Sequence, residues 1–170
     1  MEKINVTDKI YNVLFLCTGN SARSIMAEGL VNSLGKGRFR AFSAGSRPVG
    51  QVNPYAIERL QLEGIELPEA RSKSWDEFAR PDAPELDFVI TVCDNAAGEV
   101  CPAWPGQPVT AHWGVADPAA AEEHEKHLAF AKAFAVLKRR IELFTMLNPA
   151  SLERLALEEK VRDIARTGAD

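Results

Sequence analysis

The sequence is poor in cysteine and has no long hydrophobic run. Its 170 residues include only 3 cysteines, too few for the disulfide framework of a small secreted domain. No apolar stretch approaches the roughly 20 residues that a transmembrane helix needs, and the opening segment, MEKINVTDKI, is polar and mixed in charge, unlike a signal peptide. We therefore expect a cytoplasmic protein without a membrane partner, whose cysteines are either buried or chemically active.

A basic surface is also missing. The formal net charge is −4, and the lysines and arginines are scattered along the chain. The densest basic cluster, LKRR at Leu137–Arg140, is typical of a solvent-exposed helix face. This distribution argues against a nucleic-acid partner. The hydrophobic fraction of 46% and the chain length instead favour one globular domain that buries its core without disulfides.

The pattern of apolar residues predicts an α/β domain. Apolar or alternating runs over 11–17, 38–43, 85–93 and 109–114 predict strands. Helical spacing predicts helices over 22–35, 53–64 and 117–148, the first two with Ser21 and Asn53 as N-caps, and a further helix after Pro149. Residues 65–84 are predicted to form a polar connection with one short helix. This order of elements favours a mainly parallel sheet.

One cysteine directly follows the first predicted strand, in the segment CTGNSAR at 17–23. Backbone N–H groups at the start of the following helix can converge on one anion, and Arg23 adds a planar pair of donors. The helix terminus and the guanidinium predict a lowered pKa for the Cys17 thiol, and the Ser24 hydroxyl is placed to stabilise the thiolate. We interpret Cys17 as a nucleophile, with a small buried core cysteine as the alternative. The predicted oxyanion-binding residues are Thr18, Gly19, Asn20, Ser21, Ala22 and Arg23.

Further reactive groups follow the third and fourth predicted strands. The carboxyl ends of parallel strands meet at one edge of a sheet, so Cys17, Cys93 and Asp117 are expected to face one crevice. Asp117 is then a candidate general acid, a helix cap, or both. Cys101 lies eight positions after Cys93, in a loop rich in Gly and Pro, which suits thiol–disulfide exchange. The alternative is a core thiol and an unrelated loop thiol.

A zinc site is a weaker alternative for the same cysteines. Its ligands would be Cys93, Cys101, His112 and either His124 or His127, but the cysteine spacing matches no usual structural zinc site. We predict no bound metal. His124 and His127 are expected at the surface, and His112 is expected to be a packed histidine with satisfied hydrogen bonds.

The segments VLFLCTGNSARSIMAEG and SAGS resemble the low-molecular-weight protein tyrosine phosphatase superfamily, and more specifically its arsenate reductase branch coupled to thioredoxin. The resemblance runs from Tyr11 to Leu147. It implies a single-domain three-layer sandwich around a four-stranded sheet over residues 1–148, with residues 149–170 as a C-terminal helical extension. It also supports Asp117 as the acid, and a relay in which Cys93 attacks the Cys17 adduct and Cys101 then pairs with Cys93.

One departure from the tyrosine phosphatases bears on the substrate. Ala119 follows Asp-Pro where those enzymes usually place an aromatic residue that holds the substrate phenol. We therefore expect arsenate as substrate, phosphate or sulfate as competing oxyanions, and no bound cofactor. Electrons are expected from thioredoxin, with glutaredoxin as another possible donor. A phosphomonoesterase and a non-enzymatic thiol redox sensor stay open as alternatives.

Some members of the superfamily bind potassium near the oxyanion loop through a polar cluster. Asn20, Glu28 and Ser43 match part of that cluster, but the acidic ligand expected around residues 72–74 is missing. The sequence therefore gives no basis for predicting the ion.

Overall fold

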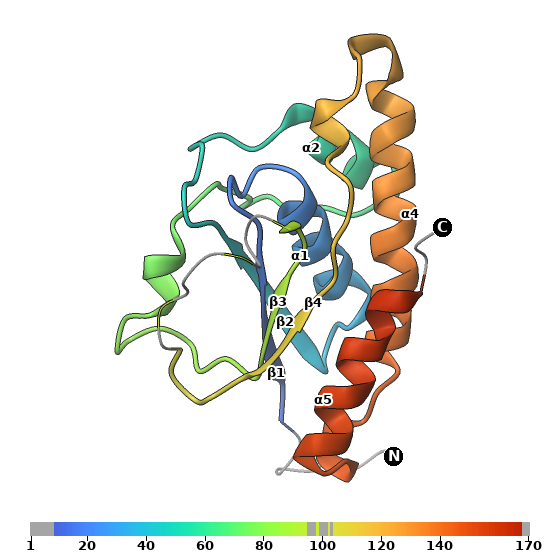
Figure 1. Cartoon of the computed structure of the whole chain (residues 1–170). Helices are drawn as coiled ribbons and strands as arrows, with labels where there is room; N and C mark the ends of the chain where they lie inside the picture. Colours follow the sequence, from blue (N-terminus) through green and yellow to red (C-terminus); the bar gives the residue numbers. More distant parts are fainter. Residues whose placement is uncertain (1–8, 95–97, 99–101, 103, 168–170) are drawn as a thin grey trace.

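The structure is a computed structural model that describes residues 9–94, 98, 102 and 104–167. A four-stranded parallel sheet in the order β2-β1-β3-β4 forms its centre (Figure 1). Its strands are β1 (Tyr11–Leu16), β2 (Phe39–Ala44), β3 (Phe88–Thr91) and β4 (Val109–His112). All four lie within or close to the apolar runs predicted as strands, although β3 and β4 are shorter. The α/β class and the parallel sheet are confirmed.

The helices differ in length and in what they cover. The α-helices are α1 (Arg23–Leu34), α2 (Pro54–Leu62), α4 (Lys126–Thr145) and α5 (Arg154–Asp163). The 3-10 helices are η1 (Trp75–Phe78), η2 (Pro118–Ala120), η3 (Glu123–Glu125), η4 (Pro149–Ser151) and η5 (Ile164–Arg166). Helix α1 packs on β1 and β2, α4 packs on α1 and α2, and α5 packs on β4.

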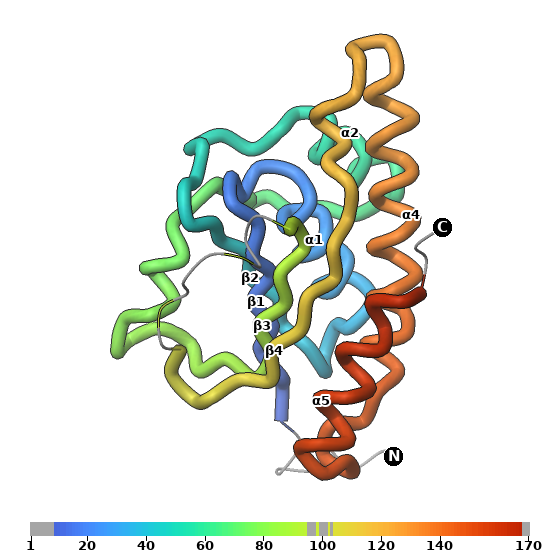
Figure 2. Tube along the Cα trace, in the orientation of Figure 1, coloured from blue at the N-terminus to red at the C-terminus, as the bar shows by residue number. Residues whose placement is uncertain are grey.

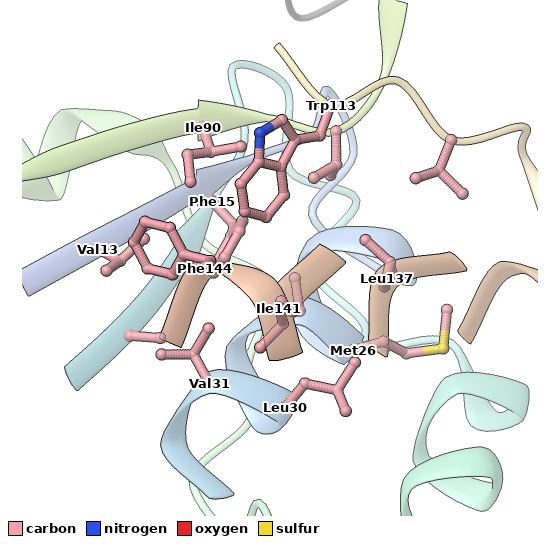
Figure 3. Close-up of a cluster of buried hydrophobic side chains, with 14 of the residues drawn as sticks. Val13, Phe15, Met26, Leu30, Val31, Ile90, Trp113, Leu137, Ile141 and Phe144 are labelled. Carbon is pink, nitrogen blue, oxygen red and sulfur yellow. The ribbon is translucent and has the colours of Figure 1, made fainter. Parts of the chain in front are cut away.

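Side chains of β1 alternate between the two faces of the sheet, as expected for a strand buried on both sides. Val13 and Phe15 join the main core beneath the helices, whereas Leu14 and Leu16 pack toward η1. In the main core, the Trp113 ring lies beside Phe15, with 6.1 Å between ring centroids (Figure 3). A helical layer, the sheet and a layer around η1 therefore form the three layers of the expected sandwich.

Two predicted helix starts were wrong. Helix α1 begins at Arg23 with Ala22 as N-cap and no capping side chain, whereas Ser21 was expected to cap it. The predicted helix over 117–148 is divided, because the Asp117 carboxylate accepts a hydrogen bond from Ala119 N–H and caps the separate short helix η2. An extended backbone at 121–122 follows, and α4 begins only at Lys126. Asn53 does cap α2, as expected.

Helix α5 packs along the β4 edge of the sheet, as the chain trace shows (Figure 2). Helix α5 contributes Leu157 and Val161 to the main core. The interpretation of the basic cluster 137–140 as a solvated face was wrong at one end, because Arg140 is 2% exposed. Leu137 is fully buried as well, so this turn of α4 presents only its two middle residues to solvent.

Candidate active site

The loop between β1 and α1, residues 17–22, directs its carbonyl groups outward. We call this segment the cysteine loop. Three of its carbonyl oxygens accept hydrogen bonds from backbone N–H groups of residues 47–53: Thr18 from Arg47 (3.0 Å), Gly19 from Val49 (3.0 Å) and Ser21 from Asn53 (2.8 Å). The N–H groups of Cys17, Thr18 and Asn20 have partners of their own, namely the Ala44 carbonyl, the Cys93 sulfur and the Cys17 carbonyl. Among the residues that the structure describes, no carbonyl accepts from the N–H groups of Ser21, Ala22 or Arg23.

Asn20 fixes the bend of the cysteine loop. Its φ of 46° lies in the left-handed region, which asparagine tolerates better than most residues. The fully buried side chain donates to the Ser24 hydroxyl oxygen at 2.9 Å and accepts from the Lys73 N–H at 2.9 Å. The bend is thus tied both to the first turn of α1 and to the segment that precedes η1.

Gly45, at the end of β2, allows the cysteine loop to approach closely. A Cβ atom at this position would lie 2.4 Å from the carbonyl oxygen of Thr18 and 2.5 Å from that of Cys17. Those distances are far inside van der Waals contact with backbone atoms, so any side chain at 45 would displace the loop. This close approach explains why the third position of the SAGS motif is a glycine.

Arg23 joins the cysteine loop to the segment that carries Asp117. Its Nη1 donates to the Val115 carbonyl at 2.8 Å, and its Nη2 lies 3.9 Å from the Asp117 carboxylate. Residues 113–117 connect β4 to η2, and we call them the Asp117 loop. A guanidinium carries five N–H donors, so Arg23 retains donors for an oxyanion while it holds this loop.

Cys93 follows β3 and meets the cysteine loop. It is 3% exposed, and its Sγ accepts a hydrogen bond from the Thr18 N–H at 3.3 Å. The Thr18 hydroxyl lies 3.7 Å from the same sulfur. The Cys93 thiol is also hydrogen-bonded to the thiol of Cys17, which is 5% exposed. Two thiols from neighbouring strands therefore meet at the base of the loop, where the sequence predicted them to be.

The pairing with Cys93 changes the acidity of Cys17. The hydrogen bond with Cys93 raises the pKa of the Cys17 thiol, and burial raises it further. The Arg23 charge and the Gly19 N–H act in the opposite direction, but they are weaker. The expected lowering of this pKa is therefore wrong for this structure. The sequence showed Arg23 and the loop N–H groups, but not the contact with a second thiol.

Asp117 is placed at the rim of the site. Its side chain is 48% exposed, and one carboxylate oxygen accepts from the Ala119 N–H at 3.0 Å. It is thus both a cap of η2 and a neighbour of Arg23, as the sequence allowed. Ala119 packs against the main core. Ser24 is fully buried and, through Asn20, is part of the cysteine loop's hydrogen bonding.

The prediction for Cys101 lies outside the described residues. The histidines of the zinc alternative are in separate places: His124 lies near Glu125, and His127 lies near Glu58. Over residues 9–94, 98, 102 and 104–167, no group of three or more His, Cys, Asp or Glu side chains is arranged to hold a metal ion.

Sequence reasoning missed a hydrogen-bonded chain beside Cys93. The His112 ring lies 2.7 Å from the Thr91 hydroxyl through Nδ1 and 2.8 Å from the Asp94 carboxylate through Nε2. The expected satisfied histidine is thus found, but its ring is 39% exposed, not buried in the core. In the sequence, Thr91, Asp94 and His112 are marked only by their positions, because each lies at or just after the carboxyl end of β3 or β4.

The polar cluster around Glu28 contains Lys73, in the segment 72–74 where a potassium site would need an acidic ligand. Ser43 donates to the Glu28 carboxylate at 2.5 Å. Burial raises the pKa of Glu28 and lowers that of Lys73, while each charge partly offsets the effect on the other. Both residues line a hollow of about 1010 Å³ along β2, formed with part of the 65–84 connection.

Fold and site together define a class of protein: a parallel α/β domain whose first strand leads into a cysteine-containing anion loop, with an arginine and a carboxylate beside it. The chain belongs to the low molecular weight phosphotyrosine protein phosphatase family, whose sequence model matches residues 12–160. The match extends past Leu147 into α5, further than the resemblance seen in the sequence.

Named relatives lie within this family. An arsenate reductase of Halalkalibacterium halodurans is 39% identical over 134 residues, which cover 78% of this chain and 93% of the relative. A solved structure titled an arsenate reductase in the phosphate binding state has a TM-score of 0.67 and 28% identity, covering 81% of this chain and 98% of the other. A thioredoxin-dependent arsenate reductase of Corynebacterium glutamicum has a TM-score of 0.55 and 25% identity, covering 82% and 65%.

The described helices give no indication of a membrane span. Within the part of the chain that the structure describes, none is both long and apolar enough to cross a bilayer.

Proposed function

We propose that this protein is an arsenate reductase that takes electrons from thioredoxin through Cys17, Cys93 and Cys101. The named relatives support the reaction, and the thioredoxin-dependent relative supports the electron donor. The observation that carries the proposal is the place of Cys93 at the base of the cysteine loop, where its Sγ accepts from the Thr18 N–H at 3.3 Å and its thiol meets that of Cys17. A hydrolase of this family needs water as its second nucleophile, whereas a reductase needs a second thiol.

The first step forms a bond between Cys17 Sγ and arsenic. The N–H groups of the cysteine loop and the Arg23 guanidinium hold arsenate, and Cys17 attacks as its thiol proton passes to an oxygen of the bound arsenate dianion. One arsenic–oxygen bond breaks, and that hydroxyl oxygen leaves as water after it takes a proton from Asp117. The 3.9 Å between Arg23 and Asp117 supports this assignment, because the acid then stands beside the group that binds the ion.

The second step is the reduction itself. The Cys93 thiolate attacks Cys17 Sγ, so that a Cys17–Cys93 disulfide forms and the sulfur–arsenic bond breaks. The electron pair of that bond stays on arsenic, which leaves as arsenite with arsenic in the +3 state. Two thiols have then lost two electrons, and arsenic has gained them. The Thr18 N–H that donates to Cys93 Sγ favours the thiolate form of the attacking group.

The last steps return the site to its starting state. Cys101 attacks Cys93 and releases Cys17 as a thiol, and the Cys93–Cys101 disulfide is reduced by the dithiol of thioredoxin. Every electron comes from sulfur, so the reaction requires no bound cofactor. Phosphate and sulfate are expected to compete with arsenate, since they match it in shape and charge.

The decisive experiment measures NADPH oxidation with thioredoxin and thioredoxin reductase, adding arsenate last, and follows hydrolysis of p-nitrophenyl phosphate in parallel. Oxidation of NADPH that depends on arsenate, with little hydrolysis, is the expected result. Glutaredoxin with glutathione replaces thioredoxin in a second arm to identify the donor. Hydrolysis without NADPH oxidation would instead make the protein a phosphatase, the function that the family description and the Arg23–Asp117 pair favour next.

Single cysteine variants separate the steps of the relay. We expect Cys17→Ser to release no arsenite, and Cys101→Ser to release about one arsenite per protein and stop as the Cys17–Cys93 disulfide. Mass spectrometry under non-reducing conditions identifies that disulfide. A Cys101→Ser protein that turns over at the wild-type rate would remove Cys101 from the relay. Oxidation of the thiols by peroxide without any arsenate turnover would favour a redox sensor.

A further inference from the structure

Arg140 is a buried cation whose described hydrogen bonds all go to backbone carbonyls. It lies on α4 and is 2% exposed. Its three described hydrogen bonds reach Thr167 O from Nε (2.8 Å), Gly114 O from Nη1 (3.1 Å) and Ala165 O from Nη2 (3.0 Å). No carboxylate forms an ion pair with it in the described part of the chain. Removing an ion from water costs several kcal/mol, so this placement requires a structural reason.

The carbonyls that Arg140 binds belong to two segments far apart in the sequence. Gly114 lies in the Asp117 loop, next to Val115, whose carbonyl accepts from Arg23. Two successive carbonyls of this loop are therefore held by two arginines, one from α1 and one from α4. Ala165 and Thr167 lie in and just after η5, at the far end of the C-terminal extension.

Packing alone does not fix the Asp117 loop against α4. A cavity of about 350 Å³ separates them, lined by residues 114–118 and by α4 side chains that include Ala129, Ala133 and Val136. Trp113 and Val115 are buried in the main core, and the Val115 N–H donates to the Val92 carbonyl at 3.0 Å, so the sheet side of the loop is fixed. On the side that faces α4 the loop borders the cavity, and there its carbonyls are held by the directed hydrogen bonds from Arg23 and Arg140.

The C-terminal extension is itself firmly attached to β4 and to the start of the Asp117 loop. The Trp113 Nε1–H donates to the Val161 carbonyl at 3.0 Å. Arg162 donates to the Thr110 carbonyl on the β4 edge at 3.2 Å. Figure 1 shows α5 alongside β4 and the lower half of α4. The carbonyls of 165 and 167 are thus held in place by α5, and they orient the Arg140 guanidinium.

We propose that Arg140 is a positioning residue for the Asp117 loop, and that residues 164–167 of the C-terminal extension are its anchor. The proposal rests on the proposed function, in which Asp117 donates a proton to the departing oxygen. Arg140 holds the Gly114 carbonyl and keeps Asp117 within reach of the ion bound by Arg23. A lysine would not replace it, because one ammonium group does not reproduce three donors held in a plane.

A double-mutant cycle tests this assignment. Arg140→Lys is expected to slow single-turnover arsenite release by about tenfold to 10²-fold, the scale of a misplaced reacting group. The same change in an Asp117→Asn background is expected to cause little further loss, because the positioned carboxyl is already gone. Arg139→Met is the matched control, since Arg139 is the exposed neighbour on the same helix. Equal losses in both backgrounds would overturn the proposal, and so would an Arg140→Lys protein as fast as wild type.

Hydrogen exchange gives a readout that does not depend on turnover. Peptides covering residues 113–121 are expected to exchange faster in Arg140→Lys and Arg140→Met, while phosphate affinity, set by the cysteine loop, changes less than about twofold. If Arg140→Met does not fold, Arg140→Lys carries the comparison. A wild-type protein that releases no arsenite would remove the proposed function and with it the catalytic role of Arg140. Unchanged exchange in these peptides would remove the structural role as well.

Discussion

The two loops that meet at the candidate site are held in different ways. The cysteine loop is fixed mainly by backbone hydrogen bonds from residues 47–53 and by the close approach of Gly45. The Asp117 loop also has backbone hydrogen bonds, from Trp113 N–H to Thr91 O (2.7 Å) and from Val115 N–H to Val92 O (3.0 Å). Its carbonyls at 114 and 115, however, are held by the side chains of Arg140 and Arg23, and a cavity of about 350 Å³ lies behind it. The Asp117 loop therefore depends on side chains from distant helices more than the cysteine loop does.

This difference determines how substitutions reach each loop. A backbone hydrogen bond survives most side-chain changes, so the cysteine loop is disrupted mainly by volume or by a changed backbone conformation. A side-chain donor is lost in a single substitution, so the Asp117 loop is sensitive to Arg23 on α1 and Arg140 on α4, which do not belong to it. The following predictions test this division.

The largest effect is expected from added volume under the cysteine loop. Gly45→Val places Cβ only 2.4 Å from the Thr18 carbonyl oxygen and 2.5 Å from that of Cys17. The loop must move, so we expect the free energy of unfolding to fall by about 3 kcal/mol and arsenite release to be lost. Urea unfolding and single-turnover arsenite assays measure the two effects.

Gly19→Ala is the matched control for stability. A Cβ atom there would lie 3.4 Å from the Val49 side chain, an ordinary contact, in the same loop. We expect its free energy of unfolding to stay within about 1 kcal/mol of wild type. If Gly45→Val were as stable as Gly19→Ala, close approach would not be what fixes the cysteine loop.

Arg23→Lys is expected to affect both loops at once. A lysine retains the charge but loses the planar donors that contact Val115 and face the ion. We expect arsenite release to fall by about 10²–10³-fold, the usual loss for one donor to a developing oxyanion, with weaker phosphate binding as well. Arg40→Lys, on the exposed side of β2, is the control. Loss of binding without loss of rate would mean that Arg23 acts only on the ion and not on the Asp117 loop.

Trp113→Phe is expected to affect the Asp117 loop and α5 but not the cysteine loop. Phenylalanine preserves the ring contacts with Phe15 and Phe144 but removes the donor to the Val161 carbonyl. A buried carbonyl left without a partner costs about 1–2 kcal/mol. We expect that decrease in urea unfolding, together with faster hydrogen exchange in α5. Trp75→Phe, a partly exposed tryptophan near η1, should change neither quantity in α5.

The sequence predicted much of the fold because its signals are local. Four apolar runs gave the strands, and Asn53 before Pro54 gave the start of α2. The errors arose where one residue satisfies two demands. Asp117 caps a short separate helix, so the long helix predicted from 117 begins nine residues later. Arg140 looked like a surface residue in a basic cluster, and only tertiary structure brings three carbonyls to it.

For the candidate site, the sequence predicted which residues meet but not how they affect one another. Cys17, Arg23, Cys93 and Asp117 each follow a strand or begin a helix, so the parallel topology brings them together. The raised pKa of Cys17 depends on a contact with Cys93, which is far away in the sequence, and no local pattern contains that contact. The chain of Thr91, His112 and Asp94 was missed for the same reason.

The smallest expected effect is a pH dependence of the free energy of unfolding that comes from Glu28 and Lys73, near the cysteine loop. Ser43, two residues before Gly45, donates a hydrogen bond to the Glu28 carboxylate. The charge of Lys73 lowers the pKa of Glu28, and the Lys73 N–H donates to Asn20 in the cysteine loop. Burial raises the pKa of Glu28 above 4.5, so the folded protein holds that proton more tightly than the unfolded chain. Stability should therefore fall as pH rises from about 4.5 through the folded value. Lys73 affects stability in the opposite direction. Because its pKa is lowered in the folded protein, stability rises with pH until the pH reaches about 10.5, the ordinary pKa of lysine.

Glu28→Gln removes the acidic part of this dependence, while its amide oxygen still accepts from Ser43. We expect urea unfolding of the variant to lose the decrease in stability that wild type shows as the pH rises above about 4.5. Glu142→Gln, at an exposed position on α4, should leave the slope unchanged. An identical slope in Glu28→Gln would mean that Glu28 stays ionised in the folded protein, held by Lys73 and Arg71. The support of the cysteine loop would then be an ionic one, as sensitive to side-chain changes as the Asp117 loop, and the contrast between the two loops would be smaller than the backbone hydrogen bonds indicate.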